Sequence, residues 1–260
     1  NTRGWTSRKG DDLPPQIDAL ADGGLLDPTV FAHCGALAGA PGKCRDDDQL
    51  GRLNITWTMG YRQDADGKPI LFDTAGNENP AGTRLMYDTL YAFGGRSFSI
   101  RDADGKLVWD SGAEIERFLA SDECKLGSAR NIPCATWFNA NHEEGDTLDN
   151  RSDNKGAEPE GVALGRIGDK TFAFVGLERM GGVLVYDITD PQAPTRVDYL
   201  NPREDWSTKD PSTVLASVGD LGPEGLHFIP AKDSPNAKPL LLVGNEVSGT
   251  TAVYQLNLSY

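Results

Sequence analysis

Four glutamates stand at matching positions of two similar stretches, and their carboxylates are the groups best suited to bind a cation. Glu160 and Glu224 each lie in a Pro-Glu-Gly sequence, while Glu178 and Glu246 each close an apolar run of the form Gly-x-Glu. Oxygen ligands of this kind suit calcium and magnesium. Arg179 directly follows Glu178, and its guanidinium group is suited to hold an anionic ligand. Cation or anion binding is therefore the chemistry to test.

The order of elements is the same in both stretches, which indicates a duplicated sheet. Pro159–Pro191 and Pro223–Leu256 each contain Pro-Glu-Gly, two apolar strands, a small-residue turn and a strand with a Val-Tyr pair. Runs such as Phe172–Val175 and Leu240–Val243 are too short for buried helices and suit a pleated surface. Repeats of short strands are typical of a propeller. We expect an all-β fold: a partial β-propeller of about three to four blades of four antiparallel strands, with loop insertions and one short helix.

We expect residues 1–260 to form this single partial propeller. Its predicted parts are an irregular segment (1–49), a divergent blade (50–110), an insertion with an acidic loop (111–157), a blade (158–201) and a blade that lacks its outer strand (221–260). Within the insertion, Ala113–Leu119 is the best helix candidate, with Ser111 as its N-cap.

The predicted topology gathers the candidate residues. In a four-stranded antiparallel meander, the start of the first strand lies beside the end of the second strand. We therefore expect a partial ring of carboxylates and arginines near the propeller axis. The predicted metal ligands are Glu160, Glu178, Glu224 and Glu246, and the predicted ligand-binding residues are Arg96, Arg179 and Asn245. In the alternative interpretation Glu160 and Glu224 are structural and accept hydrogen bonds from neighbouring strand ends.

Composition restricts the partners. The chain carries a formal net charge of −14, which argues against nucleic acid, because phosphates select basic surfaces. No apolar run approaches the length of a membrane span, and no signal peptide is present. Since the chain starts at Asn1 rather than at methionine, we expect a processed product or a fragment.

Four cysteines bracket two short loops, and none lies in a Cys-x-x-Cys pair. The economical pairing is Cys34–Cys44 and Cys124–Cys134. Two disulfides imply export to an oxidising compartment, so we expect an extracellular, periplasmic or cell-surface location. The alternative is a cytosolic protein with four free thiols.

Other chemical motifs are weak. Two Asp-Ala-Asp-Gly sequences, at Asp64 and Asp102, lack the glutamate that an EF-hand loop needs at its twelfth position, although a different calcium geometry stays open at Asp64. The sequence contains no Gly-x-Ser-x-Gly elbow, no P-loop and no His-Glu-x-x-His. Among the three histidines, we expect His227 to be packed on an inner strand. His142, which lies in the acidic run, is the better ligand candidate.

Several long motifs occur in an order that resembles the choice-of-anchor I family. They are Tyr91–Ile100, Arg151–Gly161, Gly176–Gly182, Gly222–Leu226 and Pro239–Thr251. The resemblance implies a secreted or surface-attached bacterial propeller. Members are often labelled alkaline-phosphatase-like, but the resemblance fixes no reaction. It also implies further blades on the N-terminal side, so this chain resembles the C-terminal part of a propeller.

Two functions follow as hypotheses. The first is a secreted or cell-surface propeller that binds a ligand or partner, with a divalent cation, calcium, near the axis. The second is a calcium-dependent phosphoesterase, alkaline-phosphatase-like or phytase-like, in which the cation polarises a phosphoryl oxygen. Either way, we expect the missing N-terminal propeller half, a second copy or another chain to cover the exposed blade faces.

Overall fold

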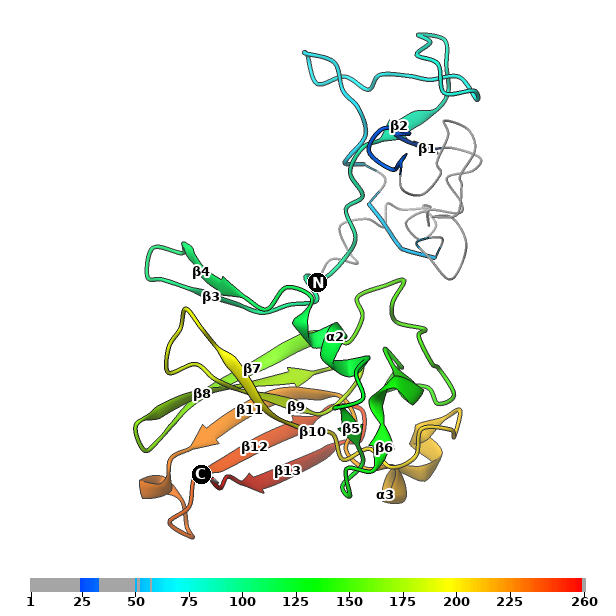
Figure 1. Cartoon of the computed structure of the whole chain (residues 1–260). Coiled ribbons are helices and arrows are strands. Elements are labelled where there is room, and N and C mark those ends of the chain that lie inside the picture. Colours follow the sequence, from blue (N-terminus) through cyan, green and yellow to red (C-terminus); the bar gives the residue numbers. More distant parts are fainter. Residues whose placement is uncertain (1–23, 33–49, 51, 57, 259–260) are drawn as a thin grey trace. The chain divides into compact units, whose positions relative to one another are not determined.

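The computed structural model describes residues 24–32, 50, 52–56 and 58–258. The chain divides between Gly94 and Gly95 into two compact units. Both consist mainly of β-strands and loops (Figure 1). Within the described residues, no helix is long and apolar enough to cross a membrane.

The N-terminal unit has a small apolar core beside two short strands. β1 (Gly24–Leu26) pairs in parallel with β2 (Leu85–Tyr87). Leu26, Ile55 and Tyr87 are buried together in this core. β1 lies in the segment that we predicted to be irregular, because three residues carry too little periodic signal to show as a strand.

The C-terminal unit contains the other described strands. They are β3 (Ser99–Arg101), β4 (Leu107–Asp110), β5 (Lys125–Leu126), β6 (Ile132–Pro133), β7 (Pro159–Ile167), β8 (Lys170–Leu177), β9 (Val183–Asp187), β10 (Thr195–Leu200), β11 (Pro223–Ile229), β12 (Leu240–Asn245) and β13 (Thr250–Gln255). Its α-helices are α2 (Glu114–Leu119) and α3 (Leu215–Val218), and its 3-10 helices are η4 (Cys134–Trp137), η5 (Pro211–Val214) and η6 (Ala231–Asp233).

Two antiparallel meanders form the framework. The first sheet has the strand order β10-β9-β8-β7, and the second has the order β11-β12-β13. These are the predicted four-stranded and three-stranded sheets of the repeat, with equivalent registers: Phe172 pairs with Asp187 in the first, and Leu240 with Gln255 in the second. The described residues form no closed ring of sheets.

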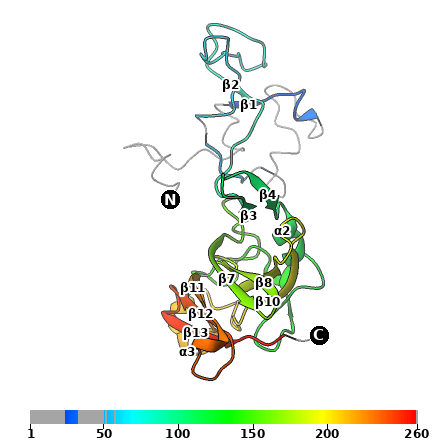
Figure 2. The same cartoon turned by 90° about the vertical axis from the view of Figure 1, so that its left-hand side faces the viewer.

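The two sheets pack face to face, with β7 and β8 against β11 (Figure 2). Phe174 stacks on Phe228 across the interface, with ring centroids 6.0 Å apart. Gly165 lies beneath the Phe228 ring, and a Cβ atom there would stand 2.5 Å from a ring carbon. Absence of a side chain at this glycine therefore permits the close approach of the two sheets.

The insertion covers the opposite face of the first sheet. Ile115 and Leu119 of α2 are fully buried against Val175 and Leu184 of that sheet. The predicted Cys124–Cys134 disulfide is present and closes the loop that carries β5 and β6. The other predicted pair, Cys34 with Cys44, lies outside the described residues.

The four strands predicted for residues 50–110 do not form one sheet. Ile55 makes a single antiparallel bridge to Ala92, which joins the first two predicted strands at one point. The last two pair separately as β3 and β4. Gly94, which stands between the two pairs, adopts a positive φ of 73° and interrupts the extended conformation that continued pairing requires.

Local interactions decide the smaller predictions: Asp102 lies in the hairpin turn that we expected, Asp64 lies in the same kind of turn, and the Ser111 N-cap is wrong. The Asp64 and Asp102 carboxylates each accept two hydrogen bonds from backbone N–H groups two and four residues later, so both sequences are hairpin turns. Ser111 does not cap α2; its hydroxyl accepts a hydrogen bond from the Phe98 N–H group, and Ala113 precedes the helix. The short helix α3 was not predicted, because one turn leaves no periodic pattern.

Candidate acidic site

The predicted glutamates lie at the same end of the strands in each sheet, as the repeat requires. Pro159 at the start of β7 pairs with Leu177 at the end of β8, and at this end the carboxylate oxygens of Glu160 and Glu178 lie within 4.8 Å of each other. In the second sheet, Pro223 pairs with Asn245. In both copies the register shifts just after the first pair, which marks a bulge at the Glu-Gly sequence. Bulges redirect side chains away from the regular ladder, and here each one carries a glutamate.

The first carboxyl pair is Glu178 with Glu160. The pKa of Glu178 is raised to about 8, first by burial and then by a hydrogen bond with Glu160, while the charge of Arg179 opposes both effects. Glu178 is 7% exposed. Two carboxyl groups in contact cannot both stay ionised without a cation between them, so the pair holds a proton at neutral pH.

The second carboxyl pair is Glu246 with Glu224. The pKa of Glu246 is raised by burial and then by the charge of Glu224 and a hydrogen bond to it. Glu160 also raises the pKa of Glu246, which places the two pairs within electrostatic reach. The backbones approach closely here as well, since a Cβ on Gly161 would lie 2.3 Å from the carbonyl oxygen of Glu224.

Arg179 is the cation among these carboxylates. Its Nε lies 3.1 Å from an oxygen of Glu178 and 3.5 Å from an oxygen of Glu158, and its Nη1 lies 3.0 Å from Glu143. The side chain is 12% exposed. Its charge is therefore shared among several carboxylates and does not neutralise all of them.

His142 joins the cluster from the acidic loop. Its Nδ1 donates a hydrogen bond to the Glu178 carbonyl oxygen at 2.7 Å, and its Nε2 accepts one from Arg179 at 3.1 Å. Burial lowers the pKa of the imidazole, so the ring is neutral at pH 7. A backbone acceptor at Nδ1 directs the Nε2 lone pair into the site, as in many metal-ligating histidines, and an ion bound there would displace the hydrogen bond from Arg179.

Glu158 is the residue that sequence reasoning missed. Its carboxylate contacts Arg151 at 2.7 Å and also pairs with Lys155. These hydrogen bonds lower its pKa even though burial opposes ionisation. The two basic residues lie in the acidic run just before it, and that clustering was the available signal.

Two groups of side chains are arranged so that one ion could contact each group. Their ligand atoms lie within 4.8 Å of one another; the groups are His142, Glu178 and Glu246, and Glu158, Glu160 and Glu178. The second group offers only oxygen and suits calcium or magnesium, while the imidazole of the first also suits zinc or manganese. Glu178 belongs to both groups.

Of three other predicted residues, Arg96 lies away from the acidic site, Asn245 lies beside Glu246 at the end of β12, and His227 differs from the prediction in its exposure. Arg96 donates hydrogen bonds to Glu116 at 2.7 Å and to the Asn154 carbonyl oxygen at 3.1 Å. Both acceptors belong to the insertion, so Arg96 stabilises the insertion and takes no part in the acidic site. The Asn245 side chain donates to Thr250 at 3.2 Å. His227 is exposed on β11 rather than packed, because its face of the second sheet is uncovered within the described residues.

Comparison with known proteins gives the family. The model of the choice-of-anchor I domain matches residues 16–191, which include the first copy of the repeat and end before the second. The chain belongs to the choice-of-anchor I family. Membership indicates a secreted or cell-surface module rich in β-structure.

One curated relative of this family member is Gigasin-3a of Magallana gigas. The two are 27% identical over 180 residues, which cover 65% of this chain and 58% of Gigasin-3a. The chain thus spans little more than half the length of that relative. No solved structure matches.

Proposed function

We propose that this chain is a secreted or cell-surface β-propeller module that binds calcium, and through it a ligand or partner, at the acidic edge of its two sheets. The observation that best supports this proposal is that each copy of the repeat holds two carboxyl groups in contact: Glu178 with Glu160, and Glu246 with Glu224. A divalent cation would replace the proton that the Glu160–Glu178 contact otherwise requires, and it would relieve the repulsion between Glu224 and Glu246.

The propeller architecture of this proposal rests on how the sheets stack. The equivalent tyrosines Tyr186 and Tyr254 point from the same face of their sheets. Tyr186 packs on the insertion, whereas Tyr254 packs on the first sheet. Each sheet thus presents the same face to the layer that precedes it, as consecutive propeller blades do.

Calcium is proposed as the ion because carboxylates predominate. Glu158, Glu160 and Glu178 supply an oxygen-only set, and calcium tolerates irregular oxygen geometry better than magnesium does. The Cys124–Cys134 disulfide supports an oxidising compartment outside the cytosol, extracellular or periplasmic.

A calcium-dependent phosphoesterase is the second candidate. The shared Glu178 favours it, because a carboxylate common to two ligand groups can bridge a pair of cations. Arg96, which we predicted to bind a ligand, is engaged with the insertion, so of the two predicted arginines only Arg179 could hold a phosphate. We therefore favour the binding module.

Isothermal titration of the EDTA-treated chain with calcium chloride tests the proposal. We expect saturable binding to the wild type, and a loss of affinity on the order of tenfold or more in Glu178→Gln, since ligand charge sets calcium affinity. Glu123→Gln is the matched control, because Glu123 is an 80% exposed carboxylate. Equal affinity in both variants would place calcium elsewhere. Calcium-dependent hydrolysis of p-nitrophenyl phosphate, lost in Glu178→Gln, would favour the enzyme instead.

A further inference from the structure

Arg203 places a positive charge in the interior of the C-terminal unit. The residue is 1% exposed. Burial lowers its pKa to about 10, and the charge of Asp205 opposes this shift, so the guanidinium group stays ionised at pH 7. A buried charge is costly unless hydrogen bonds satisfy it. The groups that accept these hydrogen bonds therefore identify what Arg203 stabilises.

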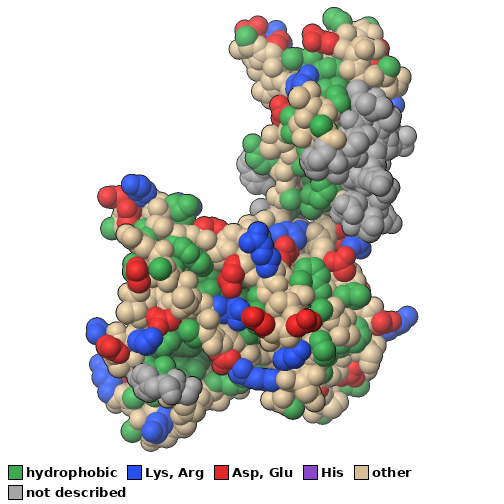
Figure 3. Space-filling view, in the orientation of Figure 1, with side chains coloured by type: hydrophobic (Ala, Val, Ile, Leu, Met, Phe, Trp, Pro, Cys, Tyr) green, Lys and Arg blue, Asp and Glu red, His purple; other side chains and the backbone are tan. Residues whose placement is uncertain are grey.

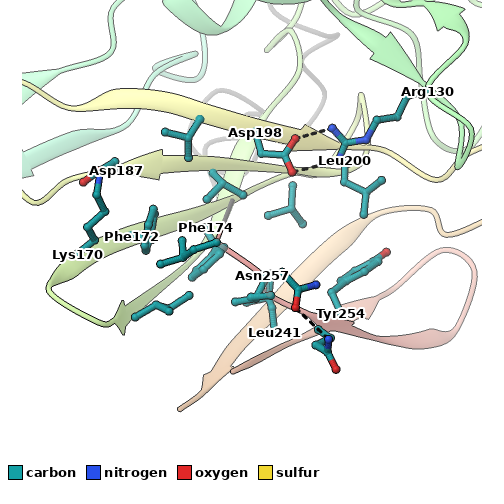
Figure 4. Close-up of a pocket in the computed structure, with 17 residues that line it drawn as sticks. Arg130, Lys170, Phe172, Phe174, Asp187, Asp198, Leu200, Leu241, Tyr254 and Asn257 are labelled. Atoms are coloured by element: carbon teal, nitrogen blue, oxygen red, sulfur yellow. Dashed lines mark hydrogen bonds and ion pairs between the residues drawn. The ribbon is translucent and has the colours of Figure 1, made fainter. Parts of the chain in front are cut away.

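Among the described residues, backbone carbonyl oxygens rather than carboxylates accept the hydrogen bonds of Arg203. Each of its three guanidinium nitrogens donates to one of them. Figure 3 shows that basic side chains at the surface lie beside acidic ones. Arg130, at the groove between the two sheets, is an example, because it donates to both oxygens of Asp198, at 2.6 and 3.0 Å (Figure 4). Arg203 differs in that it fixes the path of the backbone.

Two of the three acceptors flank the residues through which the acidic loop (residues 139–158) contacts Arg179. Nη1 of Arg203 donates to the Asn141 carbonyl oxygen at 2.7 Å, and Nη2 donates to that of Glu144 at 3.3 Å. The two residues between these carbonyl groups are His142 and Glu143, and both contact Arg179 in the acidic site. The guanidinium group of Arg203 thus holds the loop on both sides of this pair.

The segment that carries Arg203 is itself fixed by local contacts. Nε donates to the Asp205 carbonyl oxygen at 2.9 Å, and Nε1 of Trp206 donates to the Arg203 carbonyl oxygen at 3.0 Å. The guanidinium carbon lies 4.3 Å from the centroid of the Trp206 ring, which is a cation–π distance. Because this segment connects β10 to β11, the connection between the two sheets holds the acidic loop.

Backbone contacts join the loop to the same segment. The Asp146 N–H group donates to the Trp206 carbonyl oxygen at 2.7 Å, and the Gly145 N–H group donates to that of Lys209 at 3.1 Å. A Cβ atom at Gly145 would lie 2.2 Å from the Thr208 carbonyl oxygen, so a larger residue would push the loop away. The attachment therefore depends on a close approach of the two backbones, which Arg203 reinforces from the interior.

We propose that Arg203 is a positioning residue of the acidic site: by fixing the backbone of the acidic loop, it holds His142 and Glu143 in place and so maintains the affinity of the neighbouring carboxylates for calcium. This inference rests on the proposed calcium binding. Arg203 acts through the loop, since its own hydrogen bonds go to the backbone.

The contacts of Arg179 explain how the loop acts on the ion site. His142 accepts a hydrogen bond from its Nη1 at 3.1 Å, and Glu143 contacts the same atom at 3.0 Å. Nε lies 3.1 Å from Glu178 and 3.5 Å from Glu158. With the loop in place, Nη1 is thus engaged by the loop rather than by the carboxylates that calcium would use. A released loop would leave Nη1 to pair with those carboxylates, where it would compete with the ion.

Isothermal titration of the EDTA-treated chain with calcium chloride tests the effect on affinity. Arg203→Lys keeps the charge but loses the planar fork that reaches separate carbonyl groups. We expect this variant to bind calcium roughly tenfold more weakly than the wild type, as variants of groups outside the ligand shell do. Arg196→Lys is the matched control and should bind like the wild type. Arg196 also packs on an aromatic ring, 3.5 Å from the centroid of Phe118, but its ion-pair partners are Glu114 and Glu123.

Nitrogen-15 NMR of the histidine side chains gives a readout that a general loss of stability does not move. In the wild type, His142 should carry its proton on Nδ1, because this nitrogen donates to the Glu178 carbonyl oxygen and that bond sets the tautomer. In Arg203→Lys, His142 should show both tautomers. His227, which is exposed on β11, should be the same in the two proteins. Spectra recorded in EDTA make this readout independent of calcium.

The two readouts separate this inference from the proposed function. If the wild type binds calcium and Arg203→Lys binds it equally well, the positioning role is wrong and the calcium site stands. If the wild type binds no calcium, the proposed function fails, and an unchanged His142 tautomer in Arg203→Lys would overturn the positioning role as well.

A second variant covers the case in which Arg203→Lys does not fold, as judged by near-ultraviolet circular dichroism. Gly145→Ala disturbs the same attachment from the side of the loop and leaves the Arg203 side chain intact. It should show the same weaker calcium binding and the same mixture of His142 tautomers. Wild-type behaviour in both measurements would overturn the proposal.

Discussion

Replacing Arg179 by glutamine tests the charge balance of the acidic site. Contacts with Glu178 and Glu158 carry the effect, because both partners are buried, whereas Glu143 is 61% exposed and contributes little. Removing one member of a buried ion pair costs about 3 kcal/mol at the lower end of the usual range, which applies here because Glu158 keeps Arg151 and Lys155 as partners while Glu178 loses its counter-charge.

For a unit of this size, about 3 kcal/mol lowers the unfolding temperature by roughly 6–12 °C. The assay is thermal unfolding in EDTA, followed by near-ultraviolet circular dichroism of the tryptophans. Arg166→Gln is the control, because Arg166 is exposed on the same sheet and its hydrogen bond among the described residues goes to the nearby Gly168 carbonyl; its effect should stay within about 0.5 kcal/mol.

Calcium should restore much of the stability lost in the Arg179 variant. A free concentration about 100 times the dissociation constant contributes about 2.7 kcal/mol to the folded state. The calcium-dependent rise in unfolding temperature should therefore be larger in Arg179→Gln than in the wild type. An unchanged unfolding temperature in EDTA would refute the role of Arg179 as counter-cation, and a destabilised variant indifferent to calcium would refute the ion site.

Three further predictions concern the framework. Cys124→Ser with Cys134→Ser should lower the free energy of unfolding by about 3 kcal/mol in urea denaturation, as expected for a loop of this length; equal midpoints would contradict this. Phe228→Ala should cost about 3–5 kcal/mol, because its ring fills the interface between the sheets, and a loss below about 1 kcal/mol would show that the interface is loose. Hydrogen bonds, first from Lys170 and then from Thr189, lower the pKa of Asp187 to about 2. That stabilisation is present above pH 4 and disappears as the pH falls towards 2, so the stability gap between wild type and Lys170→Met should close over this range in acid titration; a constant gap would disprove the linkage.

The repeat made the two sheets predictable. Strand order, register and the edge that carries Glu160 and Glu178 follow from short apolar runs and turn glycines, which are local signals. Because the pattern is duplicated, each residue of the first copy has an equivalent in the second copy. Glu224 and Glu246 could therefore be placed at the matching end of the second sheet. Pairing of Cys124 with Cys134 was likewise predictable from their separation.

Non-local placements were not predictable. Glu158 enters the acidic site through a residue with a positive φ of 56°, at the end of a loop without periodicity. Arg96 was predicted to bind a ligand together with Arg179, but the insertion supplies it with different partners. Residues 50–110 carry strand-like runs, yet Gly94 redirects the chain between them. In each case long-range packing decides the outcome, and one sequence does not display it.

Anomalous diffraction from crystals grown with calcium tests the central claim most directly. We predict an anomalous peak between the two sheets, with oxygen atoms of Glu160 and Glu178 about 2.3–2.6 Å from it. Glu178→Gln crystals grown in the same way should lack this peak. A map without anomalous density there, in which Glu178 keeps its contact with Glu160, would contradict the calcium site.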